Sequence, residues 1–230
     1  MLTDYSIHGY NVHRFVMPVI ASNMYMIIAQ NQALIIDPHE SEEAIQLLES
    51  AGINSAYVIL THEHYDHISG VNQLRSYFTS SGRCIVYGNN DCKAMVEDPT
   101  QNMSAYFMAL MIDKTRKEQD LAKKVFKLDY RCSVDIGFKK QMNLNWQEIT
   151  IKLIETPGHS KGSICILLNT DDGYLFSGDS FIKNQTVITK LPGGDRQEYR
   201  QITRPFFDSL GDHVLVLPGH GDVGWKYEFQ

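Results

Sequence analysis

Apolar positions along the chain fall into two patterns, and their alternation predicts a mixed α/β protein. Short apolar runs bounded by turn residues predict β-strands, the first three of them at residues 16–20, 24–29 and 33–36. Apolar residues at offsets of three and four predict helices instead. One helix is expected between Ser41, whose side chain can cap its first turn, and Gly52, which ends it.

The same two patterns continue to the end of the chain. A strand at 56–60 precedes a histidine-rich loop and a helix whose apolar positions are Ile68, Val71, Leu74 and Phe78. After a strand at 84–87, residues 89–127 show helical spacing, and we interpret their methionine-rich stripe as packing rather than as a substrate pocket. Further strands are expected at 149–154, 164–168, 174–176 and 214–217, with Asp171-Asp172-Gly173 as a hairpin turn.

Length and composition indicate one domain. The chain has 230 residues, 43% of them hydrophobic and 21% charged, which suffices for a substantial core. Neither an internal repeat nor a linker-like stretch interrupts it. We therefore predict a single domain over residues 1–230, with a helical insertion at about 89–127.

Charge, termini and cysteines exclude several classes of protein. A net charge of −6 disfavours binding to a nucleic-acid backbone. The first residues lack a leader pattern and no run of eighteen apolar residues occurs, which predicts a soluble cytoplasmic protein without a membrane span. The four cysteines are widely spaced and form no Cys-x-x-Cys pair, so neither a disulfide framework nor a thiolate zinc site is expected. The oligomeric state is not readable from these features.

Candidate chemistry lies where apolar strands end. Four polar loops follow such strands, and they contain five of the nine histidines: Thr61-His62-Glu63-His64-Tyr65-Asp66-His67, Thr156-Pro157-Gly158-His159-Ser160, Ser177-Gly178-Asp179-Ser180 and Pro218-Gly219-His220-Gly221. Loops at strand ends can converge at one edge of a sheet on a rigid scaffold, as a polar site requires. Ser160 and Ser163 are expected either to hold the His159 loop in place or to be plain turn residues.

The first loop is the strongest signal. A shuffled chain of this composition would contain His-x-His-x-Asp-His on the order of once per thousand shuffles. In an extended loop His62 and His64 point the same way, while Asp66 and His67 can turn to a neighbouring point. One short segment can thus serve two metal ions. Solvated loop histidines are the alternative for any one of these residues taken alone.

These motifs resemble those of the metallo-β-lactamase superfamily, particularly its glyoxalase II-like hydrolases, from about Val12 to Gly221. The resemblance implies an αββα sandwich, in which two mixed β-sheets are flanked by helices and the metals lie at one edge. It also implies a dinuclear site: a first metal on His62, His64 and His159, a second on Asp66, His67 and His220, and Asp179 bridging both. Nitrogen and oxygen ligands of this kind suit zinc, with iron or manganese as alternatives.

Two metals can share a water, lower its pKa to about 7 and polarise a carbonyl, so we predict metal-bound hydroxide attacking an activated acyl group. Asp66 is the candidate general base. A thiol leaving group has a pKa of about 8.5 and needs little protonation, which favours a thioester as the small-molecule substrate.

The chain departs from its relatives in several places. His39 replaces the glycine that usually follows Asp-Pro, and Lys183 and Lys190 lie around an altered loop, so these three are candidate substrate contacts, with plain surface residues as the alternative. Only residues 222–230 follow the last motif, which weakens a glutathione assignment. Asp179 argues against a true β-lactamase.

Four other functions stay open from the sequence. A lactonase would use the same two metals and a different pocket. A persulfide-type dioxygenase would hold one iron on His62, His159 and Asp179. A sensor would bind metal without turnover. A phosphodiesterase is disfavoured by the acidic charge.

Overall fold

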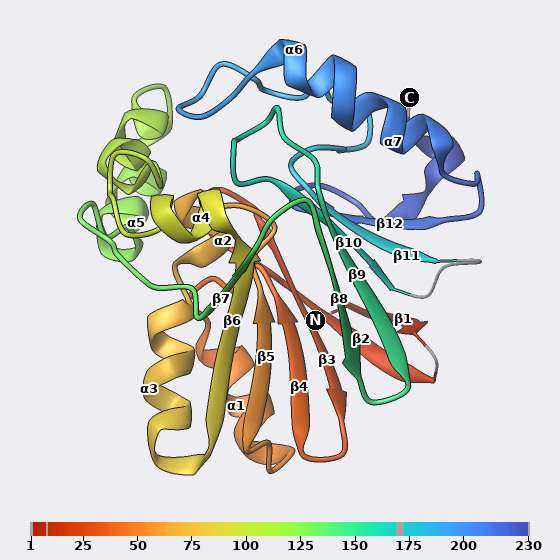
Figure 1. Ribbon diagram of the computed structural model, residues 1–230. Helices are drawn as coiled ribbons and strands as arrows, with labels where there is room; N and C mark the ends of the chain where they lie inside the picture. Colours follow the sequence, from red (N-terminus) through yellow and green to blue (C-terminus); the bar gives the residue numbers. More distant parts are fainter. Residues whose placement is uncertain (1, 8, 169–172, 230) are drawn as a thin grey trace.

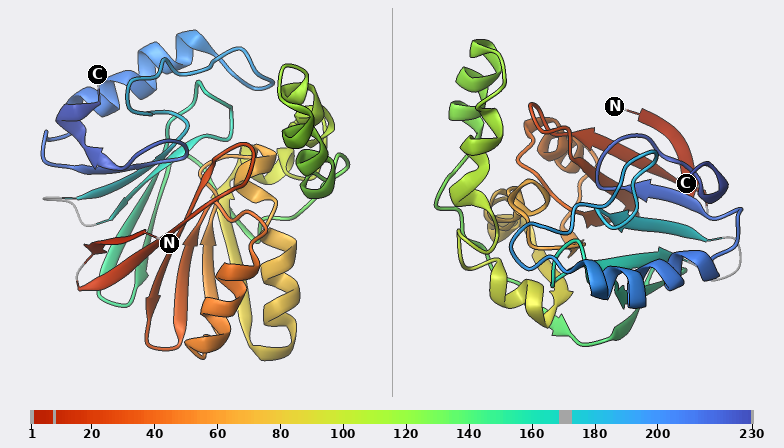
Figure 2. Two further views of the ribbon diagram at one scale, coloured as in Figure 1. Left: turned by 180° about the vertical axis from the view of Figure 1, so that it is seen from behind. Right: turned by 90° about the horizontal axis from the view of Figure 1, so that it is seen from above.

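The computed structural model describes residues 2–7, 9–168 and 173–229. Two mixed β-sheets face each other, with helices on their outer sides (Figure 1), which confirms the predicted sandwich. The turned views agree that α1 (Glu42–Ser50) and α3 (Val71–Ser81) lie beside the first sheet (Figure 2). In the same views α6 (Arg196–Glu198) and α7 (Arg204–Ser209) lie over the second sheet.

The first sheet follows chain order. Its strands are β1 (Leu2–Ile7), β2 (Tyr10–Val16), β3 (Asn23–Ala29), β4 (Gln32–Ile36), β5 (Ser55–Ile59), β6 (Arg83–Asn89) and β7 (Ile136–Phe138). The strands pair antiparallel from β1 to β4 and parallel from β4 to β7. The predicted strands at 24–29, 33–36, 56–60 and 84–87 are therefore confirmed to within two residues.

The second sheet has the order β13-β12-β11-β10-β9-β8. Its strands are β8 (Gln141–Trp146), β9 (Ile149–Glu155), β10 (Ile164–Leu168), β11 (Tyr174–Gly178), β12 (Leu215–Pro218) and β13 (Gly224–Trp225). Only β11 and β12 pair in parallel among these described strands. β10 and β11 pair antiparallel as a hairpin requires, but Asp171 and Asp172 of the predicted turn lie outside the described residues.

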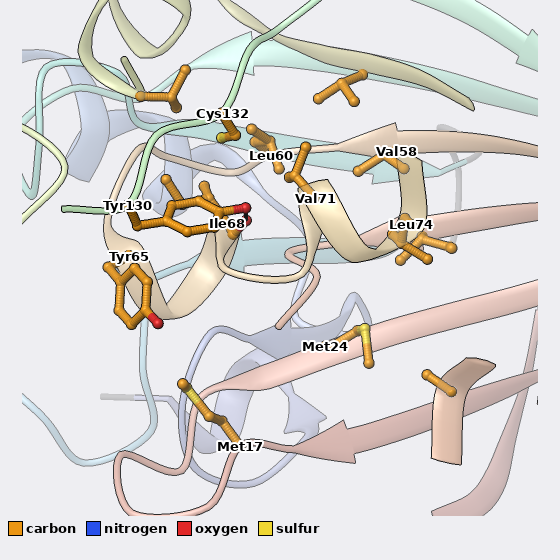
Figure 3. Packing of buried hydrophobic residues seen from close by; sticks show 14 of the residues in the cluster. Met17, Met24, Val58, Leu60, Tyr65, Ile68, Val71, Leu74, Tyr130 and Cys132 are labelled. Atoms are coloured by element: carbon orange, nitrogen blue, oxygen red, sulfur yellow. Dashed lines mark hydrogen bonds between the residues drawn. The ribbon is translucent and has the colours of Figure 1, made fainter. Parts of the chain in front are cut away.

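The core is layered because successive strand residues point to opposite faces. In β4, Leu34 and Ile36 join the cluster between the two sheets, whereas Ala33 and Ile35 join the cluster under the helices. Both faces are buried, as is usual for parallel strands covered by helices. Figure 3 shows the helix-side cluster, where Val58 lies near Val71 and Leu74 of α3.

One predicted strand was misplaced. Residues 16–20 were expected to form it, but β2 ends at Val16 and a turn follows. Pro18 lacks a donor for the ladder, and Val19 and Ala21 adopt positive φ angles of 80° and 61°. β2 itself escaped prediction because its buried residues, Val12 and Phe15, are three apart and hide the alternation of a strand.

The helix from Ser41 is confirmed, and the Ser41 hydroxyl accepts the Ala44 N–H at 3.2 Å. The helix expected after the histidine-rich loop is in fact two, α2 (Tyr65–Ile68) and α3. They part at Gly70, where a Cβ would lie 2.5 Å from the His39 carbonyl oxygen.

The predicted helical stretch at 89–127 consists of three short helices. These are α4 (Asn90–Met95), the 3-10 helix η1 (Ser104–Met111) and α5 (Arg116–Val125). Met103, at φ 69°, breaks helical geometry before η1, and a capping box at Thr115 starts α5. Two further short helices, η2 (Tyr199–Thr203) and η3 (Lys226–Glu228), lie near the C-terminus. Within the described residues, no helix is long and apolar enough to cross a membrane.

Candidate metal centre

The four polar loops meet at one edge of the sandwich. Residues 61–67 follow β5, residues 156–160 follow β9, Asp179 follows β11 and His220 follows β12. The loops are tied to each other through the backbone: Ile164 N–H donates to the Thr61 carbonyl at 2.7 Å. Ser22 forms an isolated antiparallel bridge with His220, which brings the first sheet against the last loop. Strand ends of both sheets therefore build one site.

Three histidines form the first group. His62, His64 and His159 are buried, and their ring centroids lie 4.6 to 4.9 Å apart. His159 Nε2 lies 3.0 Å from His64 Nδ1. The structure thus brings together the three residues that the sequence assigns to the first metal.

Asp66, His67 and His220 form the second group. Asp66 Oδ2 lies 3.3 Å from His67 Nε2 and 3.1 Å from His220 Nε2. Ligand atoms of all three lie within 4.8 Å of one another. These are the residues that the sequence assigns to the second metal.

Asp179 lies between the two groups. Its Oδ2 is 3.6 Å from His159 Nε2 and 3.5 Å from His220 Nε2, and its Oδ1 is 3.5 Å from His67 Nε2. One carboxylate therefore faces a member of the first group and two members of the second, as a bridging ligand must.

The donor atoms fit metal ions. The buried atoms His62 Nε2, His67 Nε2 and Asp179 Oδ1 have no hydrogen-bond partner among the described residues. Buried polar atoms without partners are costly and call for an explanation such as a bound ion. Metal–nitrogen bonds of about 2.0–2.1 Å in a tetrahedron separate neighbouring ligand atoms by roughly 3.3–3.4 Å. The separations of 3.0 to 3.6 Å across both groups match that spacing.

A second set of contacts orients the imidazoles. Asp37 Oδ2 lies 3.0 Å from His67 Nδ1, and the His159 Nδ1 lies 2.9 Å from the Ile188 carbonyl oxygen. His62 Nδ1 lies 3.0 Å from the Thr61 hydroxyl oxygen, and that hydroxyl donates to Asp37 Oδ2 at 2.5 Å. Each contact places the proton on Nδ1 and leaves the Nε2 lone pair facing the centre. The tautomer and ring orientation that a metal ligand requires are therefore already fixed in His62, His67 and His159.

The histidine pKa values differ between the two groups of candidate ligands. Burial lowers the pKa of His64 to about 3 and holds the pKa of His62 well below its usual value, so both imidazoles are neutral. Burial also opposes charge on His67, but the carboxylates of Asp66 and Asp179 raise the pKa of His67 well above its usual value. The second group therefore attracts positive charge, whether a proton or a cation.

Glu63 is a site residue that the sequence reading did not single out. Its side chain is fully buried and burial raises its pKa to about 7. The Ser160 hydroxyl donates to Glu63 Oε2 at 3.0 Å, and Ser160 and Ser163 are linked through their hydroxyls at 2.9 Å. These contacts tie the His62–His64 loop to the His159 loop. The position of Glu63 inside the first motif was the available signal.

Asp37 and Asn23 were also missed as supports of the site. Asp37 ends β4 with a positive φ of 52° and accepts the Thr61 N–H at 2.6 Å. The Asn23 amide donates to the Pro218 carbonyl at 2.9 Å and to the Gly221 carbonyl at 3.0 Å, which holds the loop around His220. Because these partners are 195 and 198 residues away in the sequence, no local pattern could reveal them.

A cavity of about 180 Å³ opens onto the centre, lined by His159, Asp179 and His220 on one side and by Ile182, Gln185, Thr186, Val187 and Ile188 on the other. The predicted contacts Lys183 and Lys190 are not among its described lining residues. Lys183 pairs with Glu228 at 3.2 Å, and Lys190 is exposed. His39 is buried rather than on the surface, and its Nδ1 lies 3.1 Å from the Glu40 carbonyl oxygen.

The sequence of residues 17–88, which includes the first motif, matches the family model described as metallo-beta-lactamase superfamily. This part of the chain is therefore similar to the metallo-beta-lactamase superfamily. The Bacillus subtilis (strain 168) protein named probable metallo-hydrolase YqgX is 28% identical over 208 residues, which cover 89% of this chain and 88% of that protein. Hydroxyacylglutathione hydrolase GloC of Haemophilus influenzae (strain ATCC 51907 / DSM 11121 / KW20 / Rd) is 25% identical over 195 residues, covering 84% and 81%.

Solved structures show the same metallo-beta-lactamase fold. The BLEG-1 B3 metallo-beta-lactamase matches with a TM-score of 0.74 and 24% identity, over 94% of this chain and 95% of that one. TTHA1623, solved in a di-iron-bound form, matches with a TM-score of 0.70 and 21% identity, over 94% and 96%. At these identities the likeness speaks for the fold and not for a substrate.

Proposed function

We propose that this protein is a dinuclear metal-dependent hydrolase that cleaves activated acyl bonds, with a thioester as its substrate. The observation that carries the proposal is the convergence of seven predicted ligands. The facing nitrogen and oxygen atoms of six of them are 3.0 to 3.6 Å apart, and the His62 ring centroid lies 4.2 to 4.9 Å from those of His64, His67 and His159. His62, His64 and His159 would hold one ion, Asp66, His67 and His220 the other, and Asp179 both. Bound there, divalent ions would lower the pKa of a water molecule and polarise the substrate carbonyl.

Asp66 is the proton acceptor in this proposal. Burial opposes its ionisation, but His67 and His220 hold the pKa of Asp66 well below its usual value. The carboxylate is therefore ionised at neutral pH and can accept a proton from the attacking water or from the tetrahedral intermediate. It faces the same point as His220, which lines the cavity.

The cavity favours a leaving group that needs no general acid. Apart from the metal-centre residues, its described lining side chains are amide, hydroxyl and aliphatic groups. A thiol, with a pKa of about 8.5, departs as a thiolate without protonation, whereas an amine or an alkoxide requires it. The hydroxyacylglutathione hydrolase among the relatives supports a thioester. A small-molecule acyl thioester is thus the substrate class that we propose, with zinc as the metal.

The test combines metal content with a matched pair of substrates. We expect two equivalents of metal per chain after reconstitution with Zn²⁺, and hydrolysis of S-lactoylglutathione that is lost in Asp66→Ala and in Asp179→Asn. A γ-lactone tested in parallel separates the lactonase alternative. Absence of hydrolysis of thioester, ester and lactone by fully loaded protein would overturn the proposal.

The iron dioxygenase alternative has a distinct signature. His62, His159 and Asp179 are all present for a single-iron site, but Asp66, His67 and His220 then have no purpose, although the structure brings them equally close. One iron per chain, together with oxygen consumption in the presence of a persulfide, would select that alternative. Two equivalents of metal without oxygen consumption would exclude it.

A further inference from the structure

A second cavity adjoins the one that opens onto the metal centre. It measures about 320 Å³, and Thr186 and Val187 line both cavities, so the two share a wall. The second cavity is also lined by Arg196, Arg200 and Arg204. Three arginines thus line a cavity that is separated from the metal-centre cavity by Thr186 and Val187. This is a local cluster of positive charge in a chain whose net charge is −6.

The spacing of the arginines explains why they share a face. They recur every four residues along the continuous helical segment α6, η2 and α7. Residues four apart on a helix are neighbours. The middle part of the segment, Tyr199–Thr203, is a π-helix, a local distortion found frequently at functional sites.

Two of the three arginines have no counter-ion among the described residues. Arg204 Nε pairs with Asp208 Oδ1 at 2.9 Å. In the described part of the chain, neither Arg196 nor Arg200 makes an ion pair or a hydrogen bond with its side chain. Nearby Asp195 is occupied as the helix cap, accepting the backbone N–H groups of residues 197 and 198. Two guanidinium forks therefore remain available to a ligand.

The arginine helix is fixed to the loop of the first metal group. Thr203 Oγ1 donates to the Pro157 carbonyl at 2.6 Å, and Asp195 N–H donates to the Gly158 carbonyl at 2.9 Å. Gly158 itself, at φ +132°, leaves no room for a side chain, because a Cβ there would lie 2.4 Å from Tyr199 Cβ. These contacts fix the position of the helical segment that carries the arginines relative to the His159 loop.

We infer that Arg196, Arg200 and Arg204 form an anion subsite for a carboxylate or phosphate group that the substrate bears at a distance from the scissile bond. The planar guanidinium fork matches both oxyanions with two parallel hydrogen bonds, whereas a point charge would not. The inference rests on the proposed function: the arginines would bind the substrate of a thioesterase whose reaction takes place at the metal centre. This subsite uses arginines in place of Lys183 and Lys190, which the sequence offered as candidate substrate contacts.

The first experiment measures anion binding without catalysis. Zinc-loaded protein is titrated calorimetrically with phenyl phosphate and with benzoate, two probes that differ only in the anionic group. The double variant Arg196→Gln/Arg200→Gln is expected to bind the preferred probe roughly 10-fold or more weakly, as loss of charge-assisted hydrogen bonds implies. Binding to the metals themselves is common to wild type and variant and cancels in the comparison.

A matched control separates local recognition from net charge. Arg83 begins β6, at the sheet end opposite the metal loops, because β5 and β6 run parallel from Ser55 and Arg83. Arg83→Gln is expected to leave binding of both probes unchanged. Equal binding by wild type and the double variant, or an equal loss in Arg83→Gln, would overturn the inference.

The second experiment uses turnover. S-acetyl-4′-phosphopantetheine and S-acetylpantetheine present the same thioester with and without a remote phosphate. We expect the wild type to favour the phosphorylated compound through a KM roughly 10-fold or more lower, and the double variant to lose this preference. A preference that persists in the double variant would refute the subsite. Failure to hydrolyse either compound would count against the proposed function alone, and the calorimetric comparison would still decide the subsite.

Discussion

Replacing Asp37 by asparagine should weaken metal binding at the site that contains His67. The Asp37 carboxylate accepts the Thr61 N–H on Oδ1 at 2.6 Å, and the Thr61 hydroxyl at 2.5 Å and His67 Nδ1 at 3.0 Å on Oδ2. An asparagine must keep its oxygen opposite the Thr61 N–H, which cannot move. Its amide nitrogen therefore takes the place of Oδ2. Asparagine also tolerates the positive φ of 52° at this position, so backbone strain does not confound the result.

The substitution changes the tautomer of His67. The Thr61 hydroxyl can rotate away from the new donor, but His67 Nδ1 then faces an N–H₂ group and must become an acceptor. The imidazole proton moves to Nε2, which is the atom that faces Asp66 and Asp179 at 3.3 and 3.5 Å. Loss of such a supporting contact typically lowers metal affinity about 10–100-fold. Loss of a hydrogen bond to a buried charge also costs about 1.5–3 kcal/mol of stability.

Metal titration against a chromophoric chelator measures the first effect, and urea unfolding of chelator-treated protein measures the second. We expect the site of Asp66, His67 and His220 to weaken most. The site of His62, His64 and His159 should weaken less, because Asp37 reaches His62 only through the Thr61 hydroxyl. Asp120→Asn removes a carboxylate of the same kind from an exposed ion pair with Lys123 and should change neither quantity beyond about 1 kcal/mol. Two sites of unaltered affinity in Asp37→Asn would refute the tautomer argument.

Three further predictions concern stability. Removing bound metal with a chelator should lower the midpoint of thermal unfolding, and reloading the metal should restore it. The stabilisation lost is about 4 kcal/mol if the loaded protein had free metal at a thousandfold excess over Kd. A midpoint unaffected by chelation contradicts metal binding. Gly158→Ala should cost about 2–4 kcal/mol in urea unfolding, because it combines positive φ with a clash against Tyr199, whereas Gly211→Ala, with no atom within 4 Å, should be near neutral. Leu48→Ala, on the buried face of α1, should cost about 2–5 kcal/mol, and similar values for the exposed neighbour Glu49→Ala would contradict the core assignment.

The site was largely predictable because ligand spacing is local information. His62, His64, Asp66 and His67 lie within six positions, and such a pattern is rare by chance. His159, Asp179 and His220 each follow an apolar strand, and strand ends gather at sheet edges. The structure adds that all seven side chains face one another.

Substrate recognition was not predictable in the same way. Lys183 was a reasonable candidate by position, but it pairs with Glu228 from the end of the chain. Arg196 and Arg200 look like ordinary helix-surface residues until the cavity that they share with Thr186 is known. A one-dimensional pattern reports which residues could bind, and not which ones are already paired.

In the sequence, hydrophobic periodicity predicted a mixed α/β protein and motif spacing predicted the metal-binding loops, because both patterns act over a few residues. The αββα sandwich and the assignment of ligands to two metals came from the resemblance to the metallo-β-lactamase superfamily. Only the tertiary structure decided how those ligands are oriented and what surrounds them. Asp37 reaches His67 across 30 residues and Asn23 reaches the His220 loop across nearly 200. The physical reason is that a buried polar atom must find its partner in space. In a fold whose two sheets meet at one edge, that partner can lie tens or nearly 200 residues away along the chain.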